Sequence, residues 1–185
     1  MKERYSTFLR RFWMVLIVGF ILYNILFPDT FSRENIVTSI QSYGNYGWAI
    51  FFLFHIIRGF VMLPSTVLIF AGVYLFPNNL FLVLLISVVG IVISSMIVYY
   101  FADKLGFAKL FDKNTKASNL VKEKLSGQYG PLFIIFWAFF PFVPTDLICY
   151  VAGAMRINPI IFGMSIFIGE LILCSVYIYG SAYFI

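Results

Sequence analysis

Apolar residues form five long stretches along the 185-residue chain, at positions 12–27, 48–76, 81–101, 132–155 and 160–185. A helix that spans a membrane needs about 20 consecutive apolar residues. The third and fifth stretches therefore predict spanning helices. The first is shorter and follows Arg10 and Arg11, which predicts an N-terminal anchor helix whose arginines reach back to the membrane surface.

The second and fourth stretches are interrupted near their middles by proline. Pro64 lies in the second stretch, and Pro141 and Pro144 lie in the fourth. Proline removes a backbone donor and clashes with the preceding helical turn, and irregular backbone at membrane depth is tolerated only where protein or a water-filled cavity satisfies it. Each stretch therefore predicts a re-entrant helical hairpin that enters and leaves the membrane on the same side.

The two interrupted stretches also resemble each other as an internal repeat. The first copy contains Tyr46-Gly47, Pro64, Ala71-Gly72 and Pro77, and the second contains Tyr129-Gly130, Pro144, Ala152-Gly153 and Pro159. The spacing differs slightly, because tyrosine and proline are 18 residues apart in the first copy and 15 in the second. Discontinuous segments at corresponding places in two halves indicate a substrate site near the bilayer midplane.

Composition places the chain among membrane proteins. Hydrophobic residues make up 62% of the sequence, charged residues only 11%, and the mean hydropathy is +0.94, which excludes an ordinary soluble domain. We expect one membrane domain, with an anchor helix and loop at 1–42 and a core at 43–185. The net charge of +5 does not predict a nucleic-acid partner, because the basic residues flank apolar spans.

Charge placement predicts how the chain is oriented in a cell membrane. The segment before Phe12 and the central segment 102–131 each carry a net charge of +3, whereas the loop 28–46 carries −1. Positively charged segments remain in the cytoplasm, so the N-terminus and the central lysine-rich segment should be cytoplasmic. This holds if the two hairpins enter from opposite faces. The predicted fold is an all-α, multi-pass membrane protein with two opposed re-entrant hairpins and about three full transmembrane helices.

Three charged residues, Arg58, Asp146 and Glu170, lie inside the apolar stretches. Each costs about 2.5–3.5 kcal/mol at the centre of a membrane helix, which makes it a functional candidate. Arg58 and Asp146 belong to different hairpins, so meeting tips would bring a cation to a carboxylate. Such a pair suits a lipid phosphate or a proton-coupled step, and it also suits a purely structural ion pair. Glu170 would pair with Arg58 or take up a proton, and Thr145 would donate to a head group or to a carbonyl freed by the prolines.

Other residues indicate packing rather than chemistry. We expect His55 to be a hydrogen-bonded core residue, and Cys149 and Cys174 to be small buried side chains without a metal or disulfide role. No catalytic motif, phosphate loop or metal-ligand spacing is present in the sequence, so we expect neither an enzyme nor a cofactor. Small residues on the third and fifth stretches predict close helix packing: Gly90, Ser94, Ser95, Gly163 and Gly169.

The segment from Pro141 to Gly153, PFVPTDLICYVAG, resembles the second hairpin of the DedA family, also called SNARE-associated or VTT-domain proteins. Pro64 through Gly72 and the region 81–106 are similar to this family too, and the resemblance covers about 43–183. It implies two opposed re-entrant hairpins and lipid translocation: phospholipid scrambling in eukaryotic relatives, and flipping of undecaprenyl phosphate or phospholipid in bacterial ones.

The chain departs from this family at two places. Where family members commonly have an arginine, three residues before the first proline of the second hairpin, this chain has Ala138. Where bacterial relatives often have an acid in the first hairpin, it has Ser65 and Thr66. We hypothesise that Arg58 replaces the missing cation.

The resemblance and the residues together predict a lipid translocase, either a flippase or a scramblase, for a phosphate-bearing lipid such as undecaprenyl phosphate or phospholipid. Its partners would be membrane lipids, with protons as a second candidate, and the sequence leaves a homo-oligomer open. A proton-coupled ion or solute transporter and a non-transporting scaffold are the alternatives. The candidate substrate-binding and transport residues are Arg58, Pro64, Pro141, Pro144, Thr145, Asp146 and Glu170.

Overall fold

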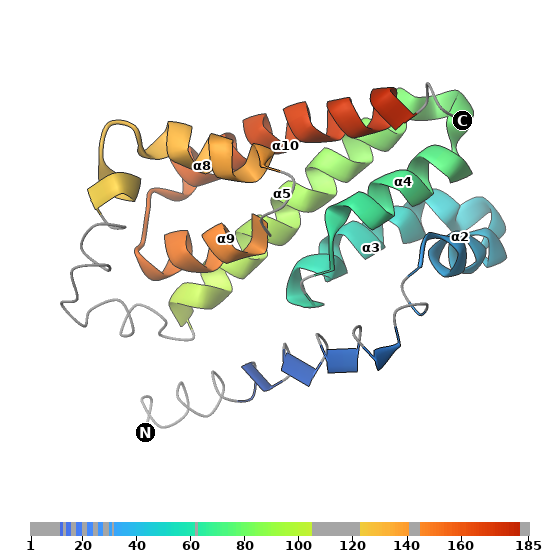
Figure 1. Cartoon of the computed structure of the whole chain (residues 1–185), viewed down its shortest axis with the longest axis horizontal. Coiled ribbons are helices and arrows are strands. Elements are labelled where there is room, and N and C mark those ends of the chain that lie inside the picture. The colour runs from blue at the N-terminus through green and yellow to red at the C-terminus, as the bar shows by residue number, and fades with distance from the viewer. Residues whose placement is uncertain are drawn as a thin grey trace.

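The computed structural model describes residues 32–61, 63–104, 123–140 and 145–181, with isolated positions between 12 and 30, and these residues form helices and their connections (Figure 1). In chain order the helices are α2 (Arg33–Ser42), η2 (Gly44–Tyr46), α3 (Gly47–Val61), α4 (Ser65–Leu75), η3 (Pro77–Asn79), α5 (Leu80–Lys104), α8 (Gly130–Phe139), α9 (Thr145–Ala154) and α10 (Pro159–Ser181).

The core repeats one pattern twice, two short helices followed by a long one. In the first half these are α3, α4 and α5, and in the second half α8, α9 and α10. Pro64 is the N-terminal cap of α4, and α9 begins directly after Pro144. The prediction that stretches 48–76 and 132–155 are not continuous helices is therefore confirmed.

The helices α5 and α10 are the two that are long and apolar enough to cross a membrane within the described part of the chain, over Pro77–Ala102 and Pro159–Ser181. At 1.5 Å per residue, the 25 residues of α5 and the 23 of α10 extend ~37 and ~34 Å. This confirms the helices predicted for the third and fifth stretches. The first stretch falls largely outside the described residues, so the third predicted span remains a prediction.

The two halves interlock through the long helices. Each long helix packs against the first short helix of its own half, α3 on α5 and α8 on α10. Each also packs against the second short helix of the other half, so that α9 lies on α5 and α4 on α10 (Figure 1). Each half therefore buries part of its helix surface against the other half.

Two separate apolar clusters line the long helices. One joins Val83, Leu84, Val88 and Ile91 of α5 to Cys174 and Ile178 near the end of α10. The other joins Val98 and Tyr99 of α5 to Phe162 and Ile166 near the start of α10. The segments of α5 and α10 between these clusters contain buried polar residues, Ser94, Ser95 and Glu170. Polar groups thus occupy the boundary between two apolar cores.

One expectation about the N-terminal part is wrong, because the predicted loop 28–46 contains the helix α2. Its start is stabilised by the Ser32 hydroxyl, which accepts a hydrogen bond from the Asn35 backbone N–H at 3.3 Å. Ile36, Val37 and Ile40 lie on one face of this helix and are buried in the first apolar cluster, where α2 packs on α4. Tertiary burial of this short apolar stripe gives the segment its helical structure.

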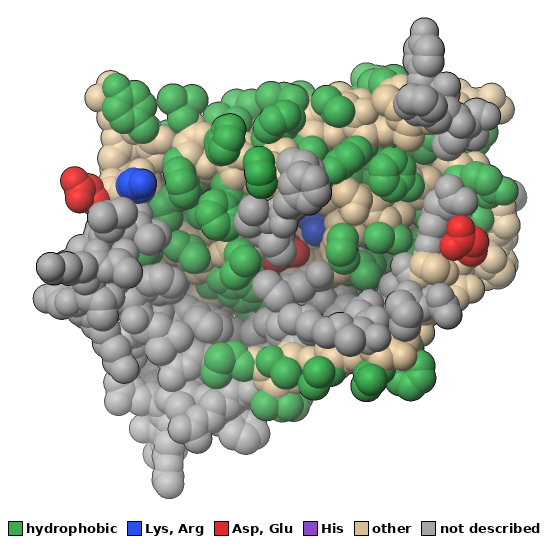
Figure 2. Space-filling model, in the orientation of Figure 1, with side chains coloured by type: hydrophobic (Ala, Val, Ile, Leu, Met, Phe, Trp, Pro, Cys, Tyr) green, Lys and Arg blue, Asp and Glu red, His purple; other side chains and the backbone are tan. Residues whose placement is uncertain are grey.

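Hydrophobic side chains dominate the described surface on the face shown in Figure 2. On α10, Ile160 and Val176 are 74% and 59% exposed, and Phe81 at the start of α5 is 65% exposed. Helices that are apolar both inside and outside are typical of proteins whose surface contacts lipid.

Small residues allow close helix contacts, as predicted. A Cβ atom added to Gly153 of α9 would overlap the Tyr99 carbonyl oxygen of α5, and one on Gly90 of α5 would lie 2.6 Å from His55 Cβ. Gly169 of α10 likewise faces Ala138 and the Ile135 carbonyl of α8. The packing role predicted for Gly90 and Gly169 is confirmed.

We expect Gly153→Ala to lower the free energy of unfolding by about 1–3 kcal/mol, because the new methyl group collides with backbone rather than with a flexible side chain. The measurement is thermal unfolding of the protein in detergent. Gly180→Ala is the matched control, since a Cβ atom there has no neighbour within 4 Å among the described atoms. Equal melting temperatures for the two variants would contradict the close contact of α9 and α5.

Candidate functional site

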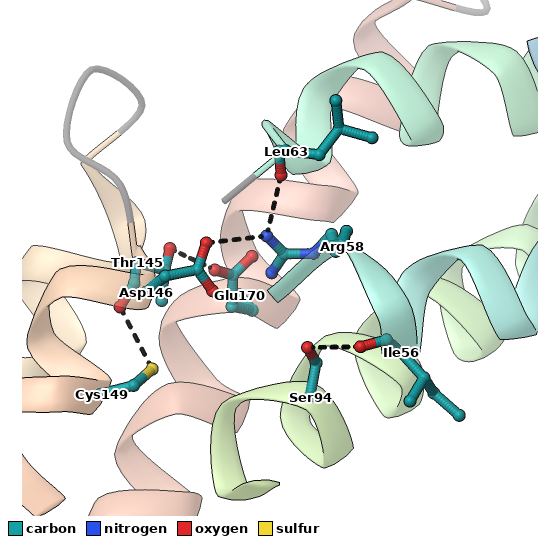
Figure 3. Close-up of polar contacts among 8 residues, drawn as sticks. All are labelled: Ile56, Arg58, Leu63, Ser94, Thr145, Asp146, Cys149 and Glu170. Atoms are coloured by element: carbon teal, nitrogen blue, oxygen red, sulfur yellow. Dashed lines mark hydrogen bonds and ion pairs between the residues drawn. The ribbon is translucent and has the colours of Figure 1, made fainter. Parts of the chain in front are cut away.

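Arg58 lies in the last turn of α3, and the residue is 3% exposed. Its Nη1 atom donates to the Leu63 carbonyl at 3.4 Å and lies 3.6 Å from Asp146 Oδ2 (Figure 3). The C-terminal end of a helix carries partial negative charge. The end of α3 therefore stabilises the buried guanidinium together with these two partners.

Asp146 lies in the first turn of α9 and is 2% exposed. The N-terminal end of a helix carries partial positive charge, so α9 favours a carboxylate at this position. The ion pair consequently joins the end of one broken helix to the start of the other, and each charge matches the dipole of its own helix. The predicted meeting of Arg58 with Asp146 is observed.

Glu170 and Thr145 complete the charged cluster, which we define as Arg58, Thr145, Asp146 and Glu170. The Thr145 hydroxyl donates to Glu170 Oε1 at 2.7 Å, and the Cys174 thiol lies 3.9 Å from Glu170 Oε2. Glu170 is fully buried and lies at the centre of α10, eleven residues from Pro159 and eleven from Ser181. Three elements, α3, α9 and α10, thus supply the cluster.

Some polar atoms of the charged cluster have no hydrogen-bond partner. Among the described residues, Arg58 Nε, Arg58 Nη2 and Asp146 Oδ1 are buried and have no hydrogen-bond partner. Buried polar atoms are nearly always paired, and leaving one unpaired costs about 1–3 kcal/mol, more for charged groups. The charged cluster can therefore form further hydrogen bonds, both as a donor and as an acceptor.

Contacts between α3 and α5 hold Arg58 in place. The Ser94 hydroxyl of α5 donates to the Ile56 carbonyl of α3 at 2.9 Å (Figure 3). Gly59, next to Arg58, lets the α3 backbone approach Ser94, because an added Cβ atom would overlap the Ser94 hydroxyl. One turn earlier, His55 is fully buried and its Nε2 lies 3.1 Å from Ser87 Oγ, which agrees with its predicted place in the core.

The structure brings together four of the seven predicted site residues: Arg58, Thr145, Asp146 and Glu170. Pro64 is exposed and caps the start of α4, so its structural contribution is the break between α3 and α4. Pro141 and Pro144 lie outside the described residues. Cys149 and Cys174 are buried, as predicted.

Sequence reasoning missed two contacts of the charged cluster. The Leu63 carbonyl binds Arg58, and a backbone acceptor leaves no mark in the sequence. Thr145 binds Glu170, and only the three-dimensional packing of α9 near α10 brings these residues together. Among the described residues, no group of three His, Cys, Asp or Glu side chains is arranged to hold a metal ion.

The described residues form helices, two of which are long and apolar enough to cross a membrane, and they enclose a buried cluster of charges of the kind found in membrane proteins. The sequence model of the VTT domain matches residues 63–183. The chain therefore belongs to the VTT-domain family, which is the DedA or SNARE-associated family. Members of this family are generally not classical enzymes.

A relative from Methanocaldococcus jannaschii, described as an uncharacterized protein, is 30% identical over 145 residues, which cover 76% of this chain and 85% of the relative. No solved structure matches the chain.

Ala138, the position at which family resemblance implies an arginine, is fully buried against α10. A Cβ atom added to Gly169 would lie 2.7 Å from Ala138 Cβ, so an arginine here requires α8 and α10 to separate. Ala138 precedes Pro144 by six residues, as Arg58 precedes Pro64. The two residues thus hold corresponding positions in the internal repeat.

A double-mutant cycle on Arg58 and Asp146 measures their coupling. We expect Arg58→Met to lower the free energy of unfolding by about 3–5 kcal/mol, because it leaves buried carboxyl groups without their cation. Adding Asp146→Asn should recover part of this loss. Thermal unfolding in detergent of the wild type, both single variants and the double variant gives the coupling energy, and additive effects would show that the two side chains do not interact.

Proposed function

We propose that this protein is a lipid translocase that moves a phosphate-bearing lipid between the leaflets of the cell membrane without covalent chemistry. The observation that carries the proposal is the Arg58–Asp146 pair, two buried charges from the two halves that meet where both halves have broken helices. Membership of the VTT-domain family supports the same function.

Helix lengths support a site near the bilayer midplane. Glu170 is at the centre of α10, so a spanning α10 carries it ~16 Å from either end, close to the middle of a hydrocarbon core about 30 Å thick. The short helices extend only ~22 Å (α3), ~16 Å (α4) and ~15 Å (α8 and α9). None of them spans such a core alone, which supports the two opposed re-entrant hairpins.

The arrangement suggests how a head group crosses the apolar barrier. Arg58 attracts the phosphate with its unpartnered donors. It occupies the position in the first half that corresponds to Ala138 in the second half, and it replaces the cation that Ala138 does not supply. Thr145 hydrogen-bonds the head group, and Asp146 releases it by competing for Arg58. The acyl chains stay in lipid. Because the charged cluster is almost completely buried, transport requires the two halves to separate around it.

The direct test is redistribution of fluorescent lipid between the leaflets of liposomes that contain the purified protein. We expect faster redistribution of phospholipid or undecaprenyl phosphate than in protein-free liposomes. Asp146→Asn should reduce this rate about tenfold or more, as expected for loss of a charged hydrogen-bonding group. Glu123→Gln, an exposed carboxylate-to-amide change, is the matched control and should keep the wild-type rate.

The alternatives predict different results in the same assay. Folded protein that accelerates neither lipid would favour the ion or solute transporter, or the scaffold. Full transport by a doubly apolar variant, Arg58→Met with Asp146→Leu, would assign the ion pair a structural role only.

The proposed orientation places the N-terminus and the central lysine-rich segment in the cytoplasm, with the segment 28–46 outside. In a Cys149→Ala, Cys174→Ala background, we expect a membrane-impermeant maleimide to label Ser39→Cys in intact cells, and Ser126→Cys only after the cells are opened. Both positions are exposed. Labelling of the two positions from the same side would mean that α3 and α4 cross the membrane completely, which contradicts a re-entrant hairpin.

A further inference from the structure

The ion pair between Arg58 and Asp146 is long for two buried groups of opposite charge. The distance from Arg58 Nη1 to Asp146 Oδ2 is 3.6 Å, whereas hydrogen bonds between such groups are usually about 2.7–2.9 Å long and are often formed in parallel pairs. Among the described residues, Arg58 Nε, Arg58 Nη2 and Asp146 Oδ1 have no hydrogen-bond partner. The two side chains therefore lie near each other without forming the bonds that their chemistry favours.

Contacts within the first half hold the Arg58 side chain back from Asp146. The Arg58 carbonyl accepts a hydrogen bond from the Leu63 backbone N–H at 3.1 Å, and Arg58 Nη1 donates to the Leu63 carbonyl at 3.4 Å (Figure 3). Leu63 is itself 5% exposed and belongs to the first apolar cluster. The turn after α3 thus binds both the backbone and the guanidinium of Arg58.

Ser94 of α5 fixes the helical turn from which Arg58 projects. Its hydroxyl donates to the Ile56 carbonyl at 2.9 Å, two residues before Arg58 (Figure 3). A serine hydroxyl inside a helix can bond to the carbonyl four residues earlier in its own helix, as Ser165 does to Ile161 at 2.8 Å. The Ser94 hydroxyl is used between helices instead. It ties the last turn of α3 to α5.

The carboxylate side of the pair is fixed on the same helix. A Cβ atom added to Gly153 of α9 would overlap the Tyr99 carbonyl oxygen, and the Tyr99 hydroxyl donates to the Ile157 carbonyl just after α9. Ser94 and Tyr99 are ~7.5 Å apart along the axis of α5. Because α3 and α9 are both attached to α5, this helix sets the distance between the two charged side chains.

We propose that Ser94 is a positioning residue, which keeps Arg58 from closing a complete ion pair with Asp146. While the bond from Ser94 to Ile56 is made, the last turn of α3 stays on α5, and the guanidinium meets the carboxylate through one long contact. Opening the pair then breaks that contact instead of two short bonds. The inference rests on the proposed function in one respect, because the pair has to open during transport.

The first experiment measures how strongly Arg58 and Asp146 are coupled. The double-mutant cycle of Arg58→Met and Asp146→Asn is carried out by thermal unfolding in detergent, once with Ser94 and once with Ser94→Ala. We expect Ser94→Ala to make the coupling energy roughly twice as large, because two short charge-assisted bonds replace one long contact. A purely structural role of Ser94 predicts an unchanged or smaller coupling energy, and that result would overturn the inference.

Ser87→Ala is the matched control. Ser87 is also a fully buried serine of α5, and its Oγ lies 3.1 Å from Nε2 of His55 on α3, one turn before Arg58. This substitution removes a hydroxyl between the same two helices without freeing the last turn of α3. It should leave the coupling energy of the ion pair at the wild-type value. An increase equal to that of Ser94→Ala would overturn the specific role of Ser94.

The second experiment measures redistribution of fluorescent lipid in liposomes. We expect Ser94→Ala to slow it about tenfold, the factor for one additional hydrogen bond to a charged group, and Ser87→Ala to keep the wild-type rate. In an Asp146→Asn background, Ser94→Ala should cause no further slowing, because the carboxylate that would capture Arg58 is absent. The same tenfold factor in both backgrounds would overturn the inference.

The two experiments separate this inference from the proposed function. If the wild type transports lipid and Ser94→Ala transports it equally fast, the role of Ser94 is overturned and the translocase remains. If the wild type moves no lipid, the proposed function is overturned, while the coupling energy measured in detergent still decides whether Ser94 holds the ion pair open.

Discussion

The buried ion pair between Arg58 and Asp146 is the interaction on which the architecture depends. Moving a charge out of water costs several kcal/mol per ion even after relaxation of the protein. The broken helices reduce this cost, because the last turn of α3 favours the cation and the first turn of α9 favours the carboxylate. A continuous helix in either half would have no terminus at this depth. The helix breaks therefore stabilise the buried charges of Arg58 and Asp146.

The charged cluster also divides the apolar interior. One apolar cluster uses the N-terminal part of α5 with the C-terminal part of α10, and the other uses the reverse combination. Polar contacts from α3, α9 and α10 fill the boundary between them. Because α9 packs on α5 and α4 packs on α10, the long helix of each half is covered by a short helix from the other half. The charged cluster therefore lies where the two halves meet.

Much of this arrangement can be predicted from the sequence, because it follows from rare residues in apolar surroundings. Pro64 marks the break between α3 and α4, and the unusual charges of Arg58 and Asp146 predict their meeting. The helix α2 was missed, since its apolar stripe of Ile36, Val37 and Ile40 is short and acquires meaning only when α4 covers it. The link from Thr145 to Glu170 depends on where α9 packs relative to α10. Local pattern does not encode that position.

Glu170 divides α10 into two arms of equal length. In the proposed translocase, a head group held beside Glu170 would have the same thickness of hydrocarbon to cross toward either leaflet, because the two arms have the same number of helical turns. Two equal arms favour neither direction of transport. The protein would set how fast the leaflets equilibrate, while lipid synthesis, lipid consumption or the membrane potential would set which way the net flow runs.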